Sequence, residues 1–234
     1  MKYTCLLFDA DNTLLDFSAA ERKAFQETCH TAGILCSDEG YRQYSHINDG
    51  LWKMLEQGAV TAEKLKVERF RLWLDWHRQN FPDRPLPDTV TPERMRDFYM
   101  VALGKQADLM PDAEEVCRTL SARYPHMYVI TNGIGEIQRS RFAKTPIWQY
   151  FRDLFIFGEI GYAKPDMRFF DAVLAKTGVT DKRTVLVIGD SLTSDMAGAI
   201  ASGLDCCYLS PNGTAPDLPV TYTIRGLAEL CTLL

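Results

Sequence analysis

Short apolar runs that alternate with helical patterns limit the possible folds of this chain more than any other feature of its sequence. The runs are rich in β-branched residues, are bounded by turn or polar residues, and occur at 4–8, 127–130, 154–157, 185–188 and 206–209. Helical patterns separate the later runs, at 112–124, 136–145, 165–177 and 194–202. Short runs of this composition are typical of strands buried on both faces, as in a parallel sheet. The alternation predicts an α/β fold, a Rossmann-like doubly wound parallel sheet.

The stretch between the first and second runs has a different texture and predicts an inserted helical domain. It contains no convincing strand, and Ser18 to Glu21 have the form of a capping box that opens a helix. Further helix starts are predicted at Ser37, Thr61 and Thr91, the last followed by a proline at the first helical position. We therefore expect residues 1–16 and 104–234 to form the core, with residues 17–103 inserted after the first strand.

Composition and charge exclude several classes of function. Of the 234 residues 46% are hydrophobic and 24% charged, which are ordinary globular values. The formal net charge of -5, without a basic stripe, argues against a nucleic-acid partner. No stretch approaches the roughly 18 apolar residues of a membrane helix, so we expect no membrane partner and a cytoplasmic protein.

The seven cysteines show no Cys-x-x-Cys pair, which favours reduced and mostly buried thiols. The adjacent Cys206 and Cys207 leave a redox-active pair as an alternative, although no neighbouring residue in the sequence supports it.

Four polar clusters stand where predicted strands end or helices begin. They are Asp9-Ala-Asp11-Asn-Thr13, Thr131-Asn132-Gly133, Lys164-Pro165 and Gly189-Asp190-Ser-Leu-Thr-Ser-Asp195. Each by itself has an ordinary explanation as a turn, a helix cap or a solvated lysine. In open α/β sheets, however, ligands gather outside the carboxyl ends of the strands. Taken together, the clusters predict one site.

The charges of this site call for a cation. Asp9, Asp11, Asp190 and Asp195 would repel one another and raise one another's pKa unless a positive ion lay among them. Carboxylate oxygens suit Mg²⁺, which also keeps positions for water and for a phosphate oxygen. The sequence therefore predicts a magnesium site.

The four clusters, in this order, resemble the motifs of the haloacid dehalogenase-like hydrolase superfamily, and the resemblance covers the whole chain. It implies that Asp9 is the nucleophile that becomes phosphorylated and that Asp11 is the general acid and base. It also implies that Asp9, Asp11 and Asp190 hold Mg²⁺, and that Asp195 is either a further ligand or a support for the ligands. The helical insertion lies where the family places its mobile cap domain.

The same resemblance assigns the phosphate of the substrate to Thr131, Asn132 and Lys164. Glycine and a following helix start, as in Thr131-Asn132-Gly133, suit close approach of an anion. The motif strings look like those of the pyrimidine 5'-nucleotidase branch, which implies a nucleoside 5'-monophosphate such as UMP as substrate.

Several alternatives stay open from the sequence. Another small metabolite, such as a sugar phosphate or phosphoglycolate, could be the substrate, because the motifs do not contact the leaving group. A 2-haloacid dehalogenase is disfavoured by Asp11, since a halide leaves without a proton. A non-catalytic binding protein is disfavoured because the acidic residues are all present. The choice between monomer and homodimer is not decided.

Overall fold

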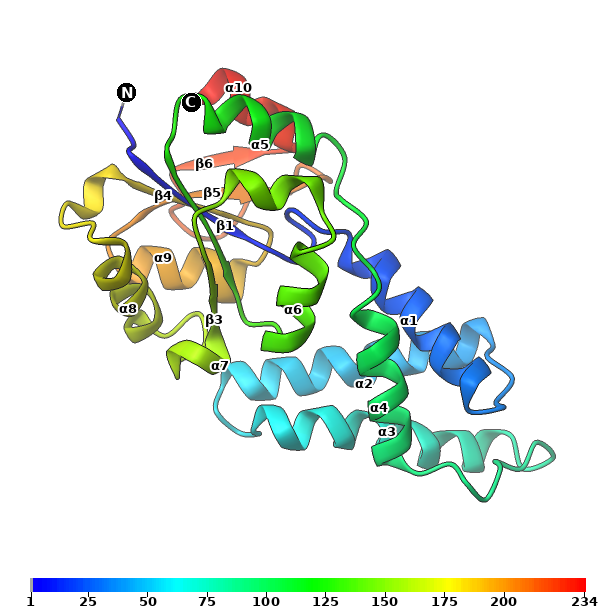
Figure 1. Ribbon diagram of the computed structural model, residues 1–234. Helices are drawn as coiled ribbons and strands as arrows, with labels where there is room; N and C mark the ends of the chain where they lie inside the picture. Colours follow the sequence, from blue (N-terminus) through cyan, green and yellow to red (C-terminus); the bar gives the residue numbers. More distant parts are fainter. Residues whose placement is uncertain (1) are drawn as a thin grey trace. The chain divides into compact units, whose positions relative to one another are not determined.

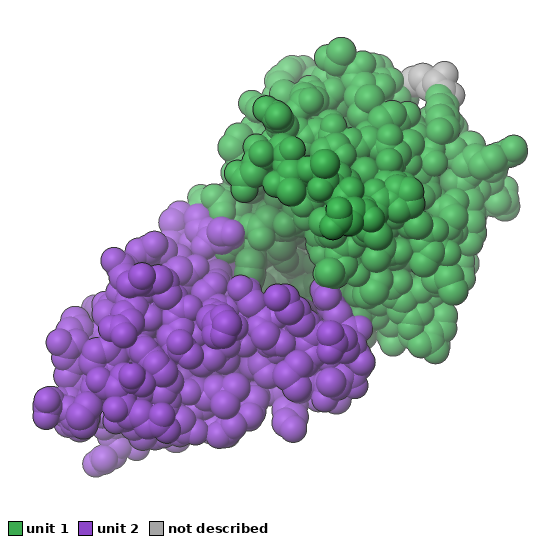
Figure 2. Space-filling model, turned by 180° about the vertical axis from the view of Figure 1, so that it is seen from behind, with its two compact units in different colours: residues 1–17, 107–234 green, residues 18–106 purple. Residues whose placement is uncertain are grey.

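The computed structural model describes residues 2–234, and it shows two compact units (Figure 2). Unit 1 runs from the N-terminus to Phe17 and from Ala107 to Leu234, and unit 2 comprises Ser18–Gln106. Unit 2 therefore begins one residue after the expected start of the insertion, 17, and ends three residues after its expected end, 103. None of the helices formed by residues 2–234 has the length and apolar character that crossing a membrane requires.

Among the described residues, unit 1 contains a six-stranded parallel sheet in the order β3-β2-β1-β4-β5-β6 (Figure 1). Its strands are β1 Cys5–Asp9, β2 His126–Thr131, β3 Leu154–Ile156, β4 Val185–Gly189, β5 Asp205–Leu209 and β6 Tyr222–Ile224. Leu7 of β1 pairs with Tyr128 of β2 on one side and with Val187 of β4 on the other. The chain thus winds outward from β1 in both directions, which confirms the predicted doubly wound α/β class.

Helices cover both faces of this sheet. One set is α5 Ala113–Ser121, α6 Gly135–Phe142, η1 Pro146–Tyr150, η4 Leu227–Glu229 and α10 Leu230–Leu233. The other set is α8 Met167–Thr177, the short π-helical turn η3 Leu192–Met196 and α9 Ala197–Ala201. The remaining short helices are α7 Phe157–Ile160 and η2 Lys182–Thr184.

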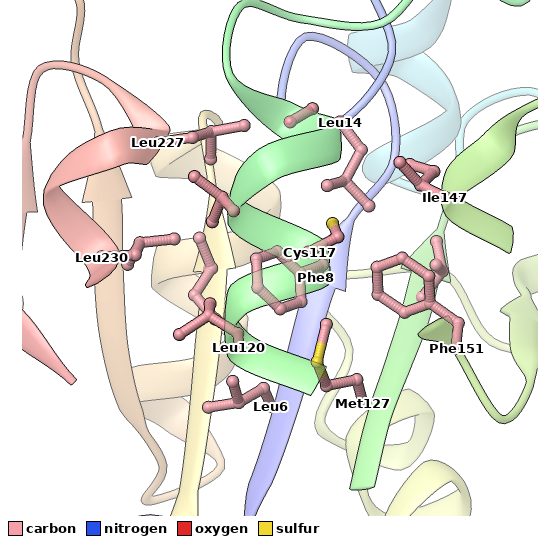
Figure 3. Packing of buried hydrophobic residues seen from close by; sticks show 14 of the residues in the cluster. Leu6, Phe8, Leu14, Cys117, Leu120, Met127, Ile147, Phe151, Leu227 and Leu230 are labelled. Atoms are coloured by element: carbon pink, nitrogen blue, oxygen red, sulfur yellow. The ribbon is translucent and has the colours of Figure 1, made fainter. Parts of the chain in front are cut away.

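Alternate residues of the strands pack into two separate hydrophobic cores. Leu6 and Phe8 pack in the cluster that contains Cys117 and Leu120 of α5 (Figure 3). Leu7 instead packs in a second cluster with residues of α8 and α9. Because side chains alternate between the faces of a strand, a strand buried on both faces must be apolar throughout. The continuous apolar runs in the sequence follow from this arrangement.

Unit 2 consists largely of the helices α1 Phe17–Thr31, α2 Asp38–Glu56, α3 Ala62–Asn80 and α4 Pro92–Leu103. The predicted N-caps are confirmed, since the side chains of Ser37, Thr61 and Thr91 accept hydrogen bonds from backbone N–H groups three residues later. The rings of Phe25, Tyr44, Phe70, Trp73 and Tyr99 pack against one another in its core.

The predicted capping box at Ser18 is wrong. Helix α1 already begins at Phe17, so Ser18 lies inside its first turn. Glu21 is buried and accepts hydrogen bonds from Tyr41, Ser45 and Asn48 of α2. The glutamate joins two helices, and its spacing from Ser18 only imitates a cap.

Candidate active site

The turn after β1 presents two carboxylates. Asp9 ends the strand and is 6% exposed. The backbone N–H groups of Leu14 and Leu15 both donate to the Ala10 carbonyl at 2.9 Å, which closes the turn tightly. Asn12 has φ +59°, in the left-handed region that asparagine enters more readily than most residues. This turn brings Asp11, whose side chain is 25% exposed, to the same edge of the sheet as Asp9.

Lys164 joins the first and last predicted motifs. Its Nζ donates to Oδ1 of Asp9 and to Oδ1 of Asp195, both at 2.6 Å, and the residue is 1% exposed. Burial opposes the charged amine, but the two carboxylates outweigh burial and raise the pKa of Lys164. A permanent cation therefore lies between Asp9 and Asp195.

Asn132 fixes the loop that carries this lysine. Its Nδ2 donates to the Lys164 carbonyl at 2.8 Å, and its Oδ1 accepts from the Lys164 N–H at 2.8 Å. The two bonds tie the end of β2 to the loop before α8. The amide of Asn132 thus positions Lys164, and its predicted contact with a phosphate stays a prediction.

Asp9, Asp190 and Asp195 form a tight acidic cluster, with one oxygen of each carboxylate within 4.8 Å of the others. Burial, together with the charge of Asp195, raises the pKa of Asp9 well above its ordinary value. The same two causes raise the pKa of Asp190 to about 7. Asp195 is held from its other side, because its Oδ2 accepts a hydrogen bond from the Ser191 N–H at 3.2 Å.

The donor set fits a divalent cation. Asp9, Asp11, Asp190 and Asp195 carry four negative charges when ionised, and the ion pairs of Lys164 and Arg141 offset two of them. One divalent cation would balance the remaining two charges. Hard oxygen ligands of this kind suit Mg²⁺.

Two residues of α6 that the sequence analysis missed contact Asp11. Arg141 Nη1 donates to Asp11 Oδ1 at 2.5 Å, and Gln138 Nε2 donates to Asp11 Oδ2 at 2.6 Å. Gln138 also donates to the hydroxyl of Thr131 at 2.9 Å. The sequence did hold a signal for them. Gln138 and Arg141 are three positions apart on a helix, so they share one face, and the neighbouring apolar residues Ile137 and Phe142 indicate that this face is buried.

The structure thus brings all seven predicted site residues to the carboxyl edge of the sheet. The contacts form three links, namely Asp9–Lys164–Asp195, Lys164–Asn132 and Asp11–Gln138–Thr131. Asp190 joins them through the acidic cluster. Carboxylate oxygens, a buried amine and hydrogen-bond donors in one place are the kinds of group that phosphoryl transfer uses.

Comparison with known proteins gives a consistent family. A family model described as haloacid dehalogenase-like hydrolase matches residues 3–203. The chain is 30% identical over 235 residues to the putative HAD-hydrolase YfnB of Bacillus subtilis, covering 100% of this chain and 96% of that protein. A structure of YfnB bound to magnesium, which reveals interdomain movement, matches with a TM-score of 0.89 at 30% identity, covering 100% of this chain and 99% of that one.

The similar proteins include two pyrimidine 5'-nucleotidases. Pyrimidine 5'-nucleotidase YjjG of Escherichia coli is 30% identical over 240 residues, covering 100% of this chain and 99% of that protein. Pyrimidine 5'-nucleotidase PynA of Streptococcus pneumoniae is 32% identical over 213 residues, with coverage of 91% and 86%. A dehalogenase structure with a TM-score of 0.75 is only 19% identical and covers 100% of this chain and 97% of that one, so it shows the fold alone.

Proposed function

The chain belongs to the haloacid dehalogenase-like hydrolases, and on that premise we propose that it is a magnesium-dependent phosphatase of nucleoside 5'-monophosphates. Phosphoric monoester hydrolase is the enzyme class that the family and its relatives support. Among nucleotides, the proposed preference is for those with a pyrimidine base.

The contacts of Asp11 carry the proposal. A second carboxylate held two residues after Asp9 can give a proton to an alkoxide leaving group and later take one from water. A nucleoside leaves as such an alkoxide, whereas a halide needs no proton. The site therefore supports phosphate ester hydrolysis over dehalogenation.

The proposed reaction has two steps. In the first, a carboxylate oxygen of Asp9 bonds to phosphorus while the bond to the nucleoside oxygen breaks, and Asp11 protonates that oxygen. In the second, Asp11 takes a proton from a water molecule that attacks the same phosphorus, which releases phosphate and restores Asp9. Lys164 and the Thr131 hydroxyl would donate to the phosphoryl oxygens and stabilise their charge.

The proposed metal site uses the carboxylates of Asp9 and Asp190 and the backbone carbonyl of Asp11. Both oxygens of Asp195 already accept hydrogen bonds, from Lys164 and from Ser191, so we assign Asp195 to supporting the site. When bound, Mg²⁺ would supply positive charge for the phosphoryl oxygens.

Substrate selection is proposed to lie in the helical insertion, residues 17–103, as the cap. All the site residues described above belong to unit 1, and none of their roles involves a base or sugar. Identities of 30% and 32% to two pyrimidine 5'-nucleotidases support the nucleotide over other metabolites.

A substrate panel tests this proposal. We expect the highest kcat/KM with pyrimidine nucleoside 5'-monophosphates among nucleotides, sugar phosphates and phosphoglycolate. Activity should disappear with excess EDTA and return with Mg²⁺. A sugar phosphate preferred tenfold, which corresponds to about 1.4 kcal/mol in transition-state binding, would reject the nucleotide assignment. Full activity in EDTA would reject the metal.

A further inference from the structure

We propose that Gln138 and Arg141 of α6 are positioning residues, which hold the Asp11 carboxylate and orient the Thr131 hydroxyl for the reaction. This inference rests on the proposed function, because it gives Asp11 and Thr131 the roles assigned there. Neither residue belongs to the four sequence motifs.

Gln138 and Arg141 engage both oxygens of Asp11. Arg141 Nη1 reaches Oδ1 at 2.5 Å, Gln138 Nε2 reaches Oδ2 at 2.6 Å, and Arg141 Nη1 also donates to Gln138 Oε1 at 3.1 Å. Gln138 and Arg141 are each 1% exposed, so packing fixes their side chains. Charge-assisted bonds are shorter and stronger than neutral ones. Asp11, which stands in a partly exposed turn, is thus held from a helix in the core of unit 1.

Gln138 also determines what the Thr131 hydroxyl can do. The Thr131 Oγ1 accepts one hydrogen bond from the Gly133 N–H at 2.9 Å and another from Gln138 Nε2 at 2.9 Å. A hydroxyl has two lone pairs and one proton to donate. With both lone pairs engaged, Thr131 can only donate, which suits a phosphate oxygen. The side-chain amide of Gln138 therefore positions both Asp11, the proposed proton-transfer residue, and Thr131, the proposed phosphate contact.

Gly133 makes room for this arrangement. A Cβ at Gly133 would lie 2.3 Å from Gln138 Nε2 and 2.7 Å from its Cδ. An alanine at position 133 would therefore force the end of the Gln138 side chain to shift. Gly133→Ala offers a way to move Gln138 without deleting it.

The same helix supplies a matched control. Residues three apart on a helix share a face, so Gln138 and Arg141 point toward Asp11 together. Arg139 lies between them in sequence, is half exposed, and pairs with Glu159 at the surface. Arg139→Met removes an arginine from α6 without touching Asp11.

The first experiment compares leaving groups. p-Nitrophenol leaves without a proton, whereas the nucleoside of UMP needs one. Gln138→Leu and Arg141→Met should lose at least about tenfold more kcat/KM with UMP than with p-nitrophenyl phosphate, because proton transfer contributes about a hundredfold or more. Arg141→Lys should recover part of the loss, and Arg139→Met should match the wild type. Equal losses with the two substrates in both variants would mean that neither residue positions Asp11 for proton transfer, and would overturn the inference.

The second experiment does not depend on catalysis. Crystal structures of Gln138→Leu, Gly133→Ala and Arg139→Met should show the Asp11 carboxylate displaced or in several conformers in the first two, and in place in the third. An unmoved Asp11 in both Gln138→Leu and Gly133→Ala would overturn the inference, whatever the activity. The two proposals can fail separately. If Asp11 is displaced in the variants but the wild-type protein hydrolyses no phosphate ester, the proposed function is contradicted, and the finding that Gln138 holds Asp11 in place still stands.

Discussion

Lys164 shows how single residues in this site depend on one another. Its amine is buried and lies 2.6 Å from carboxylates of both Asp9 and Asp195, so either acid would be left with an unpaired buried charge if the lysine were removed. Removing one partner of a buried pair is far more damaging than losing a surface pair. Substitutions in this group therefore report stability as well as catalysis, and informative variants must preserve shape.

Asp11→Asn keeps the size of the side chain but removes the titrating group, together with one of the two acceptors that Gln138 and Arg141 use. We expect its steady-state turnover of UMP to fall about a hundredfold to ten-thousandfold, the usual contribution of general acid-base catalysis. With p-nitrophenyl phosphate, rapid-quench or stopped-flow measurement should show a burst of p-nitrophenol followed by slow turnover. Asp9→Asn should abolish the burst with this substrate. Near wild-type turnover of UMP by Asp11→Asn would contradict its role as acid and base.

Gly189→Ala tests the packing behind the acidic cluster. A Cβ at Gly189 would lie 2.4 Å from Asp195 Oδ2, so the aspartate must shift, which disturbs its ion pair with Lys164. We expect the free energy of unfolding to fall by about 3 kcal/mol, as for a broken buried pair, measured by urea denaturation. Gly50→Ala is the control, because nothing lies within 4 Å of its added Cβ and alanine favours a helix interior. Similar stability of the two variants would contradict this packing argument.

Among the helices and strands, hydrophobic periodicity and helix-end signals predicted the elements that have a continuous apolar run or a local capping residue. The four inner strands β2, β1, β4 and β5 have continuous apolar runs because both of their faces are buried, and the caps at Ser37, Thr61 and Thr91 have local signals. The edge strand β6 has three residues, only one of them buried, and gives no run to detect.

The site residues likewise fall into those that the sequence predicts and those that it does not. Asp9, Thr131 and Asp190 lie at or directly after the ends of strands, a position that the sequence can predict, whereas Lys164 follows α7 and Asp195 lies in η3. Gln138 and Arg141 were missed because their partner, Asp11, is more than a hundred positions away. Glu21 was misassigned because its hydrogen-bond partners lie on the next helix, beyond the reach of a local capping pattern.

Glu21 offers a test of how α1 and α2 are joined. Glu21→Ala removes the acceptor of three hydrogen bonds, which leaves the buried Asn48 with an unsatisfied donor. We expect a loss of about 1–3 kcal/mol in unfolding free energy by urea denaturation. Glu27→Ala on the same helix removes only an exposed pair with Lys105 and should cost less than about 1 kcal/mol. Equal costs would argue against the joining role of Glu21.

For the whole molecule, we expect the acidic cluster to make stability depend on pH and on a bound metal. The folded protein holds the pKa of Asp9 and of Asp190 above their ordinary values, that of Asp190 at about 7. Without metal, the folded state thus binds more protons than the unfolded state between about pH 4 and pH 7. These two groups therefore lower the stability as the pH rises through that range.

Mg²⁺ should reverse this loss, because it binds the ionised carboxylates in competition with protons. We expect Mg²⁺ at about a hundred times its Kd to raise the thermal midpoint by roughly 5–10 °C at pH 8, and by less at pH 5.5. Differential scanning calorimetry against EDTA at matched ionic strength measures both shifts. Asp190→Asn should weaken the response at pH 8. An equal shift at the two pH values would contradict the assigned carboxylate ligands.

The central position of β1 has a consequence for how this protein is made. Cys5 pairs with His126 and with Val185, so the strand that ends in Asp9 leaves the ribosome long before either neighbour exists. At synthesis rates of about 5–20 residues per second, β1 waits on the order of ten seconds or more for β4. The segment 18–106 is continuous and has all its own helices by then. In the nascent chain the helical segment can therefore form first, while the apolar strand that ends in Asp9, the proposed nucleophile, has no partner strands to cover it until the middle of the sheet has been synthesised.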